Sequence, residues 1–203
     1  MPDQQPYAAL LAKGEDRRQR ILAVAQRLLT RHGWHGITLA QIAREAGVTP
    51  AGLLHHFESK EQLLHAALDA RDADDEAHAD RTGDLLEELQ HVVDRFHRAP
   101  DLAGLFTVLR AENLDPDALL HQRFLTRQRS AIDTVADGIR RGQRTGRYRP
   151  DVDAALKAAE IVAFLTGIET IWLLDRTTQL TEVFKEYTGS LARQLLAQPL
   201  DGP

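Results

Sequence analysis

Apolar residues recur three and four positions apart along almost the whole chain, and no stretch shows a sustained strand-like alternation of apolar and polar residues. Because an α-helix turns once in about 3.6 residues, this spacing gathers apolar side chains on one face of each helix. The pattern predicts an all-α protein of about nine helices. The expected helices are residues 17–32, 38–45, 50–57, 60–79, 84–98, 101–113, 117–142, 152–174 and 181–197.

Short polar signals divide the first 60 residues into helices. Gly33 follows the first helix where a left-handed residue is needed to end it. Thr38 and Ser59 each have a glutamine three residues later, which is the pattern of a capping box at a helix start. Thr49 and Pro50 have the residue types preferred at an N-cap and at the first helical position, so they predict the start of a short helix.

Three regions follow from these signals. Residues 1–14, which begin with two prolines among the first six residues, are expected to form a loose arm. Residues 15–62 are expected to form a small helical head, and residues 63–203 a larger body of longer helices. No internal repeat or low-complexity segment interrupts this division.

Composition narrows the class of protein. The 203 residues are 43% hydrophobic and 27% charged, which is ordinary for a folded domain, and the absence of cysteine excludes disulfides and thiolate metal sites. The longest apolar runs, such as residues 161–168, are too short to span a membrane, and no secretion signal precedes the first helix. We therefore expect a cytoplasmic protein with no membrane partner.

Charge is divided unevenly along the chain, whose net charge is −5. Residues 1–62 carry eight Lys or Arg and six Asp or Glu, whereas the remainder carries seventeen and twenty-four. The head is thus slightly basic and the body clearly acidic. This asymmetry favours a polyanion-binding head on a body that repels nucleic acid.

Residues 39–58, LAQIAREAGVTPAGLLHHFE, have the pattern of a helix-turn-helix. Apolar positions face inward on both helices, a small alanine lies where the helices meet, and Gly47 lies in the turn. The same spacing also fits a three-helix core that only looks like a DNA-binding motif. We favour DNA binding.

The segment from Arg20 to Leu63 resembles the N-terminal domain of the TetR family of transcriptional regulators. The shared features are a Gly-aromatic-x-Gly link (Gly33 to Gly36), Ile-Ala, Ala-Gly-Val and a closing His-His-Phe-x-Ser-Lys (His55 to Lys60). The resemblance implies an all-α dimer whose body binds a small effector and supplies the dimer interface. Residues 146–175 are similar to the dimerisation helix of the choline-responsive branch, without naming an effector.

The helix at 50–57 is expected to enter the major groove with one face. On a helical wheel Leu53, His56 and Phe57 share the buried face, and Ala51, His55 and Glu58 lie opposite. The candidate DNA contacts are Thr38, Gln41, Thr49, Pro50, Ala51, Gly52, Leu54, His55 and Lys60.

These residues divide by the part of DNA they suit. Thr38, Thr49 and Lys60 are candidate phosphate anchors, together with helix N-terminal amides. In the family that the segment resembles, members commonly place a tyrosine at the position of Leu54 to hold a phosphate, and that hydroxyl is absent here. Leu54 alternatively lies half-tucked against the first helix without contacting DNA. His55 is expected to read a base edge, or to contact phosphate, or to stack on a neighbour without touching DNA.

Pro50 and Ala51 suit thymine methyl groups, and Gln41 can donate a hydrogen bond from the helix before.

Other groups of residues give weaker indications of function. Glu88 and His91 have metal-ligand spacing, as do Asp94 and His97, but both pairs fall on one helix where a di-metal bundle needs two such helices. No metal or other cofactor is expected. A run of arginines at 140–149 is interpreted as a surface cluster at a helix end. No catalytic motif occurs, so an enzyme is not expected.

The body's last two helices are the expected partner surface, and its aromatic residues the expected effector pocket. The interface candidates are Ile161, Leu165, Gly167, Ile168, Phe184, Tyr187 and Leu191. The pocket candidates are Phe96, Phe106, Leu109, His121, Phe124, Arg127, Glu169 and Trp172. Each set also has the simpler interpretation of a plain monomer core.

Two function classes remain from the sequence. The first is a dimeric repressor that binds a palindromic operator on double-stranded DNA and is released by an unidentified small molecule. The second is an all-α small-molecule carrier or enzyme with a vestigial head. A regulator that activates, or that has no effector, also fits the sequence.

Overall fold

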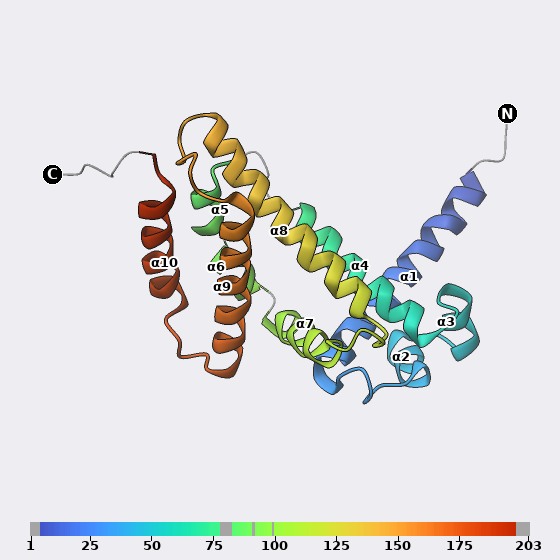
Figure 1. The fold of residues 1–203 in the computed structure, drawn as a ribbon. Coiled ribbons are helices and arrows are strands. Elements are labelled where there is room, and N and C mark those ends of the chain that lie inside the picture. The colour runs from blue at the N-terminus through green and yellow to red at the C-terminus, as the bar shows by residue number, and fades with distance from the viewer. Residues whose placement is uncertain (1–4, 78–82, 91, 99, 198–203) are drawn as a thin grey trace. The chain divides into compact units, whose positions relative to one another are not determined.

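The computed structural model describes residues 5–77, 83–90, 92–98 and 100–197, and the described residues form helices joined by short connections (Figure 1). The helices are α1 (Gln5–His32), α2 (Leu39–Ala46), α3 (Pro50–His56), α4 (Lys60–Ala77), α5 (Leu85–Gln90), α6 (Val92–Arg98), α7 (Pro100–Glu112), α8 (His121–Arg144), α9 (Ala154–Leu174) and α10 (Leu180–Leu195). The all-α prediction is confirmed. Within the described ranges, no helix combines the length and apolarity needed to cross a membrane.

The chain divides into two compact units, residues 1–79 and 80–203. The boundary expected after residue 62 moves because α4 packs within the first unit. Leu64, Ala67 and Leu68 on α4 are buried, and Gln26 Nε2 on α1 donates a 3.1 Å hydrogen bond to the Ala67 carbonyl. α4 therefore packs against α1 and contributes to the core of the first unit.

The first helix begins earlier than its polar start predicted. The loose arm expected over residues 1–14 is helical from Gln5 onward, so that expectation is wrong for residues 5–14, while residues 1–4 lie outside the described ranges. Residues 8–13 are Ala, Leu and Lys, which are strong helix formers. Pro6 falls in the first turn, where a missing backbone N–H costs nothing.

Two glycines shape the link between α1 and α2. Gly33 ends α1 with a φ of 67°, and its N–H donates a 2.8 Å hydrogen bond to the Leu29 carbonyl. This left-handed conformation was predicted, and it favours glycine because a Cβ is strained there. Gly36 meets a different need, since a Cβ at this position would overlap the carbonyl of His32.

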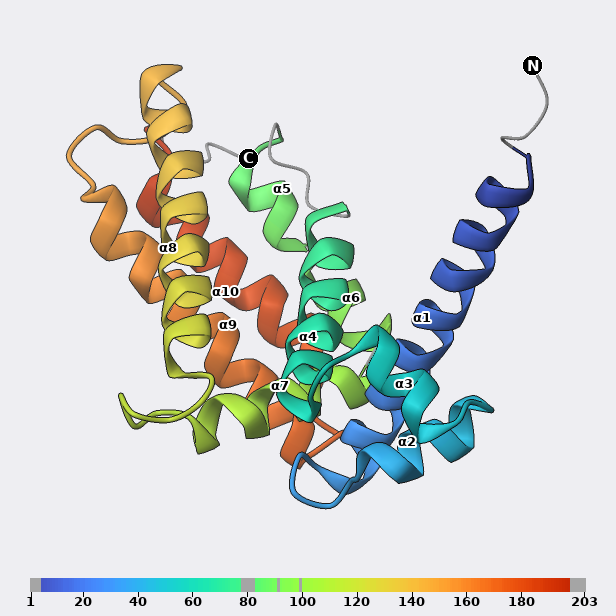
Figure 2. The ribbon, with the colours of Figure 1, turned by 90° about the vertical axis from the view of Figure 1, so that its right-hand side faces the viewer.

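The second unit is built around α8, α9 and α10 (Figure 2). Its core includes a group of aromatic rings: Phe96 stacks on Trp172 with 6.4 Å between ring centres and meets Phe184 edge to face at 6.0 Å. The helix expected at 84–98 corresponds to α5 and α6, on either side of residue 91, which is not described. Burial of these apolar faces is the main force holding the unit together.

Tyr148 locks the connection between α8 and α9. Its side chain is buried, its hydroxyl donates a 2.9 Å hydrogen bond to Asp84 Oδ2, and a Cβ at Gly142 would overlap its ring. Burial, followed by Asp84, raises the pKa of Tyr148. The neutral hydroxyl therefore joins the start of α5 to the end of α8.

Candidate nucleic-acid interface

The turn between α2 and α3 has the geometry of a helix-turn-helix. Gly47 follows α2 in the left-handed region with a φ of 68°, and its N–H points back to the carbonyls of Ala43 and Arg44. Ile42, Ala43 and Leu53 are buried at the junction of the two helices. The small side chain of Ala43 allows the close approach that the motif needs.

Both threonine caps predicted from the sequence are present. Thr38 Oγ1 accepts a 3.2 Å hydrogen bond from Gln41 N–H, and Thr49 Oγ1 accepts a 3.0 Å bond from Gly52 N–H. A hydroxyl that accepts such a bond keeps its own proton for donation. Each threonine can therefore cap a helix and still donate to a phosphate oxygen beside that helix's N-terminus.

The two faces of α3 separate as the helical wheel predicted. Leu53 and Phe57 are buried, whereas Pro50, Ala51 and His55 are exposed. Gly52 and Gln41 are half-buried beside this surface. Leu54 is 46% exposed, which is consistent both with a DNA contact and with a side chain half-tucked against the first helix.

The end of α3 lies beside the arginines of α1. The guanidinium carbon of Arg18 lies 5.1 Å from the centre of the Phe57 ring, a cation–π distance. His56 is half-buried beside it, and its ring meets that of His55 edge to face with 5.6 Å between centres. Burial lowers the pKa of His56 below 6.5, and the charges of His55, Arg17 and Arg18 lower it further. His56 is thus favoured in its neutral form.

Lys60 has a role that the sequence did not indicate. Its Nζ donates a 2.6 Å hydrogen bond to the carbonyl of Trp34 and lies 4.2 Å from the centre of the Trp34 ring. The lysine therefore fastens the start of α4 to the link between α1 and α2. An ammonium has three donors, so this bond leaves two of them for a phosphate.

The predicted pocket residues form two groups rather than one. Phe96 and Trp172 stack within the core of α6, α9 and α10. Phe106 and Phe124 meet edge to face on α7 and α8, with the Arg127 guanidinium 5.7 Å from the Phe106 ring centre. Leu109 is buried on the same helix as Phe106.

The polar members of the pocket set are partly buried near α7. Thr107 Oγ1 donates a 2.8 Å hydrogen bond to Glu169 Oε1, which joins α7 to α9. His121 Nδ1 lies 3.2 Å from the Asn113 carbonyl at the start of α8. Glu169 is thus placed beside α7, while His121 helps to fix the connection before α8.

The predicted dimer residues need correction. Ile161, Ile168, Phe184 and Leu191 are buried within a single chain, so they belong to its core, and Leu165 packs against the same core. Their periodicity misled because α9 is apolar on all sides, so its sequence does not show which side faces the unit's interior. Gly167 is exposed and Tyr187 is half-buried in a groove between α9 and α10.

The structure describes the other groups of candidate residues only in part. Within the described ranges no three His, Asp or Glu side chains gather as metal ligands, and His91 lies outside those ranges. In the arginine cluster, Arg140 pairs with Asp137, Arg147 with Asp84 and Arg149 with Asp151. These pairings fit a surface cluster that stabilises the end of α8.

A capped helix-turn-helix whose second helix exposes one face defines a DNA-binding protein of the helix-turn-helix class. A profile of the family described as "Bacterial regulatory proteins, tetR family" matches residues 21–67. The HTH-type transcriptional repressor AcnR of Corynebacterium diphtheriae is 30% identical over 136 residues, which cover 67% of this chain and 70% of AcnR. The chain therefore belongs to the TetR family, and it is a DNA-binding transcriptional regulator.

Two further comparisons extend the likeness to the second unit. The HTH-type transcriptional regulator SrpR of Pseudomonas putida is 27% identical over 194 residues, covering 93% of this chain and 89% of SrpR. The crystal structure of a TetR transcriptional regulator from Chloroflexus aurantiacus matches with a TM-score of 0.74 and 24% identity, over 91% of this chain and 98% of that one. The fold that TetR regulators share therefore extends over both units, across the 91% of the chain that this match covers.

Proposed function

We propose that the protein is a homodimeric repressor that binds a palindromic operator and is released from it by a small-molecule effector. The observation that carries this proposal is the exposed face of α3, held on a capped helix-turn-helix in a chain of the TetR family. The name of AcnR, a transcriptional repressor, favours repression over activation. A repressor of this kind acts on the chromosome, in the cytoplasm.

The DNA contacts of the proposal follow from the first unit's surface. Thr38 and Thr49 donate to phosphates beside their helix N-termini, and Lys60 adds a positive charge. His55 donates to a base edge, and Ala51 lies against thymine methyl groups. Pro50, Gly52 and Leu54 complete the surface, with Gln41 reaching it from α2.

The dimer interface of the proposal is the exposed side of α9. Leu156 is 72% exposed, Ile171 54% and Leu174 85%, and Ala163 and Gly167 lie between them on the same side of the helix. Glu160, which pairs with Lys157, is the charged residue on this side. A mostly apolar exposed stripe of this kind is typical of a protein–protein contact. A two-fold axis through it would give the self-complementary interface of a C2 dimer.

The effector of the proposal binds in the second unit beside Phe106, Phe124 and Arg127, with Glu169 as a polar partner. Aromatic walls with a few charged groups are typical of small-molecule sites. A coupling free energy of about 1 to 3 kcal/mol between effector and operator would change operator affinity roughly 5- to 150-fold.

Selection of bound duplexes from random DNA tests the DNA-binding part directly. The expected product is a pair of inverted half-sites whose centres lie about one helical turn, or a multiple of it, apart. Recovery of a single unpaired half-site would contradict the palindrome. The recovered sequence also locates the regulated gene, whose expression decides between repressor and activator.

Sedimentation of the Ala163→Arg variant tests the dimer. An unpaired charge placed on the apolar side of α9 is expected to cost several kcal/mol of association and to give a monomer at micromolar concentration. Ala111→Arg adds the same charge at an exposed position of α7 and should remain dimeric. A dimeric Ala163→Arg variant would show that the interface lies elsewhere.

A further inference from the structure

The link between α1 and α2 holds Trp34 in a defined place. Gly33 begins the link with a φ of 67°, a Cβ at Gly36 would overlap the backbone of the preceding turn, and Ile37 is 2% exposed. A link that requires glycine at two positions and ends on a buried isoleucine has few other conformations. Thr38, the N-cap of α2 and a candidate phosphate donor, follows it directly. Trp34 is therefore fixed near the N-terminus of α2.

The ammonium of Lys60 lies against two groups of Trp34 at once. Lys60 Nζ donates a 2.6 Å hydrogen bond to the Trp34 carbonyl and lies 4.2 Å from the centre of the Trp34 ring. Both side chains are half-buried, which strengthens the attraction between a cation and an aromatic face. A lysine ammonium on its flexible four-carbon stem is thus held at one point.

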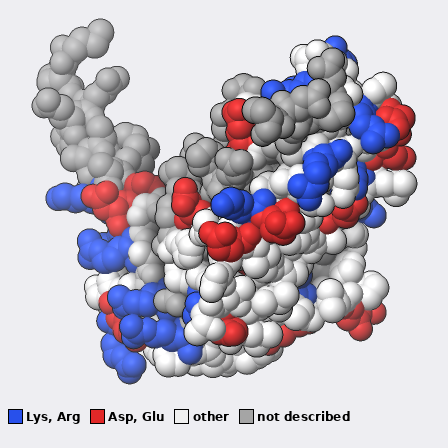
Figure 3. Space-filling model, turned by 90° about the vertical axis from the view of Figure 1, so that its left-hand side faces the viewer, with Lys and Arg blue, Asp and Glu red and all other residues white. Residues whose placement is uncertain are grey.

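Carboxylates flank Lys60 in the sequence, yet within the described ranges it forms no ion pair. Glu58 and Glu61 are its near neighbours, and neither is bonded to it there. In the second unit, by contrast, Lys157 pairs with Glu160, and Figure 3 shows acidic and basic side chains interspersed on the face that it views. Lys60 is held instead by a carbonyl and a ring, neither of which carries a negative charge. Its own charge stays available to an anion.

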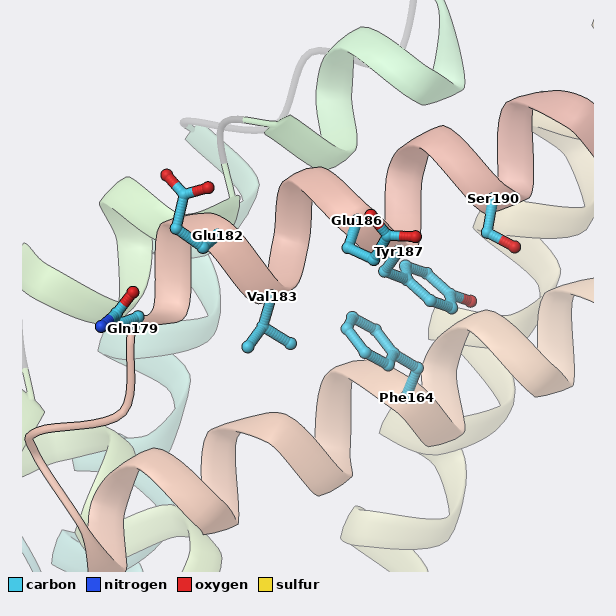
Figure 4. Close-up of a pocket in the computed structure, with 7 residues that line it drawn as sticks. All are labelled: Phe164, Gln179, Glu182, Val183, Glu186, Tyr187 and Ser190. Atoms are coloured by element: carbon cyan, nitrogen blue, oxygen red, sulfur yellow. The ribbon is translucent and has the colours of Figure 1, made fainter.

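The ring of Trp34 is not part of an aromatic cluster in the described part of the chain. Other half-buried rings stack on one another, as Phe164 and Tyr187 do in the groove between α9 and α10, with 3.5 Å between ring centres (Figure 4). Trp34 has no such neighbour among the described residues, and the partner of its ring is the ammonium of Lys60. Packing of aromatic rings therefore does not explain Trp34.

The position of Lys60 at the first residue of α4 does not stabilise that helix. The N-terminal end of a helix carries a partial positive charge, which favours an acidic side chain and disfavours a cation. Ser59 Oγ already accepts a 3.1 Å hydrogen bond from Gln62 N–H, and Glu61 supplies the acidic residue of the first turn. The end of α4 is thus satisfied without Lys60, so a lysine here serves something other than the helix.

We propose that Trp34 is the positioning residue for the phosphate contact of Lys60. Its carbonyl and ring hold the ammonium, free of carboxylates, where a phosphate of the DNA backbone meets it. The inference rests on the proposed DNA contacts and adds the residue through which one of them acts. The carbonyl takes one N–H of the ammonium and the phosphate takes another, so Trp34 itself touches no DNA. Because phosphate contacts carry no sequence information, Trp34 sets affinity and not base preference.

A double-mutant cycle separates this role from a packing role. Trp34→Leu removes the ring and keeps the carbonyl and an apolar side chain, and Lys60→Met removes the charge and keeps most of the stem. Trp34→Leu alone should weaken binding to operator and to random duplex alike, roughly two- to fivefold. In the Lys60→Met background the same substitution should change affinity by less than about 1.5-fold, because the ring then has no ammonium to hold.

Two matched variants control the cycle. Trp34→Phe keeps an aromatic face and should bind within about twofold of wild type. Arg31→Met removes an exposed cation from the end of α1, beside the same link, and Trp34→Leu should keep its full effect in that background. Circular dichroism at the temperature of the binding measurement identifies the variants that are fully folded.

The outcomes distinguish this proposal from the proposed function. An equal loss from Trp34→Leu with lysine and with methionine at position 60 would overturn the proposal, since Trp34 would then support only the fold of the link. A loss on the operator alone would overturn it as well, because it would place Trp34 in base reading. In both cases the wild type still binds its operator, and the proposed repressor stands. A wild type that binds no duplex would contradict the proposed function itself.

The emission of Trp34 gives a second measurement that needs no substitution at this residue, and so applies even if Trp34→Leu does not fold. In a Trp172→Phe background Trp34 is the single tryptophan. A phosphate that binds the ammonium reduces the positive charge over the ring, so saturating random duplex should change the emission. The change should be much smaller in Lys60→Met. An equal change in both proteins would assign the signal to the DNA alone and would overturn the proposal.

Discussion

His55 has the longest exposed polar side chain on α3 and lies in its last turn, so single substitutions can reveal how this helix reads DNA. We expect His55→Ala to cost roughly 1 to 3 kcal/mol on the operator and to relax base preference at one symmetric pair of positions. Binding to random duplex should change little. Titrations of wild type and variant on operator, on single-base operator mutants and on random DNA at one salt concentration measure all three.

The outcome also separates the other two roles of His55. A phosphate contact would reduce affinity equally on operator and random DNA. A histidine that only meets the ring of His56 would leave every affinity unchanged, and that result would remove His55 from the interface.

Leu54 is the large apolar side chain on the exposed surface of α3. We expect it to pack on a thymine methyl group, whose loss would cost about 0.8 kcal/mol, or roughly fourfold in affinity. Replacing each operator thymine by deoxyuridine removes the methyl group without changing the base pair.

The Leu54→Ala variant provides the control for this experiment. Wild type should lose affinity at one symmetric pair of thymines, and Leu54→Ala should bind the two duplexes equally there. Equal losses in both proteins at every thymine would assign the methyl contacts to other residues, with Ala51 the first to examine.

At the scale of elements, the short helix α3 depends on its N-cap. Thr49→Ala removes the oxygen that accepts from Gly52 N–H and should lower the free energy of unfolding of the first unit by about 1 kcal/mol. Urea unfolding followed by Trp34 fluorescence in a Trp172→Phe background measures this unit, because the chain has two tryptophans. Thr49→Ser keeps the oxygen and should retain most of the stability; an equal loss in both variants would point to the lost methyl group instead.

The surroundings of His56 make the first unit sensitive to acid. Burial, together with His55, Arg17 and Arg18, lowers its pKa, against a smaller opposing effect of Glu15. Below pH of about 6.5 the unfolded chain binds this proton more readily than the folded unit, so stability decreases as pH falls through 6.5 towards the lower folded pKa.

Unfolding of wild type, His56→Gln and the exposed control His35→Gln between pH 7.5 and about 5, where histidines titrate, checks this prediction. The loss in acid should be smaller in His56→Gln than in the other two proteins. Identical pH curves for all three would show that other groups cause the acid sensitivity.

The sequence predicted well the helix ends that are fixed by hydrogen bonds between neighbouring residues. Thr38, Thr49, Gly33 and Gly47 fix helix ends through bonds to neighbouring residues, so their types and spacing were sufficient. The exposed face of α3 followed from helical geometry alone.

The sequence did not predict which side of each helix packs against the rest of the unit, or which distant residues contact each other. α9 is apolar all round, so periodicity assigned its buried residues Ile161 and Ile168 to an interface and left its exposed stripe unnoticed. The bond from Lys60 to Trp34 joins residues far apart in sequence, and no local pattern indicates it. The start of α1 was not predicted. The two prolines indicated a loose arm, whereas the good helix formers that follow them form a helix.

For the whole molecule, the division of charge predicts how DNA binding responds to salt. The net charge of −5 would repel DNA if it were spread evenly, but the first 62 residues carry more Lys and Arg than Asp and Glu. Each phosphate neutralised by the first unit releases bound counterions, so the logarithm of the affinity should fall linearly with the logarithm of salt concentration, by about 0.9 for each contact. A flat plot would contradict the DNA contacts proposed for this unit.

Lys60→Ala tests one of those contacts within the same experiment. If one of the remaining donors of Lys60 meets a phosphate, the slope should become shallower by about one unit, equally on operator and random DNA. The variant also loses the bond to Trp34, so its affinity is compared at a temperature where its first unit is fully folded. Arg129→Ala removes the same charge from an exposed position of the second unit and should leave the slope unchanged. An unchanged slope in Lys60→Ala with a lower free energy of unfolding would make Lys60 a purely structural residue, whose ammonium holds α4 to the preceding link.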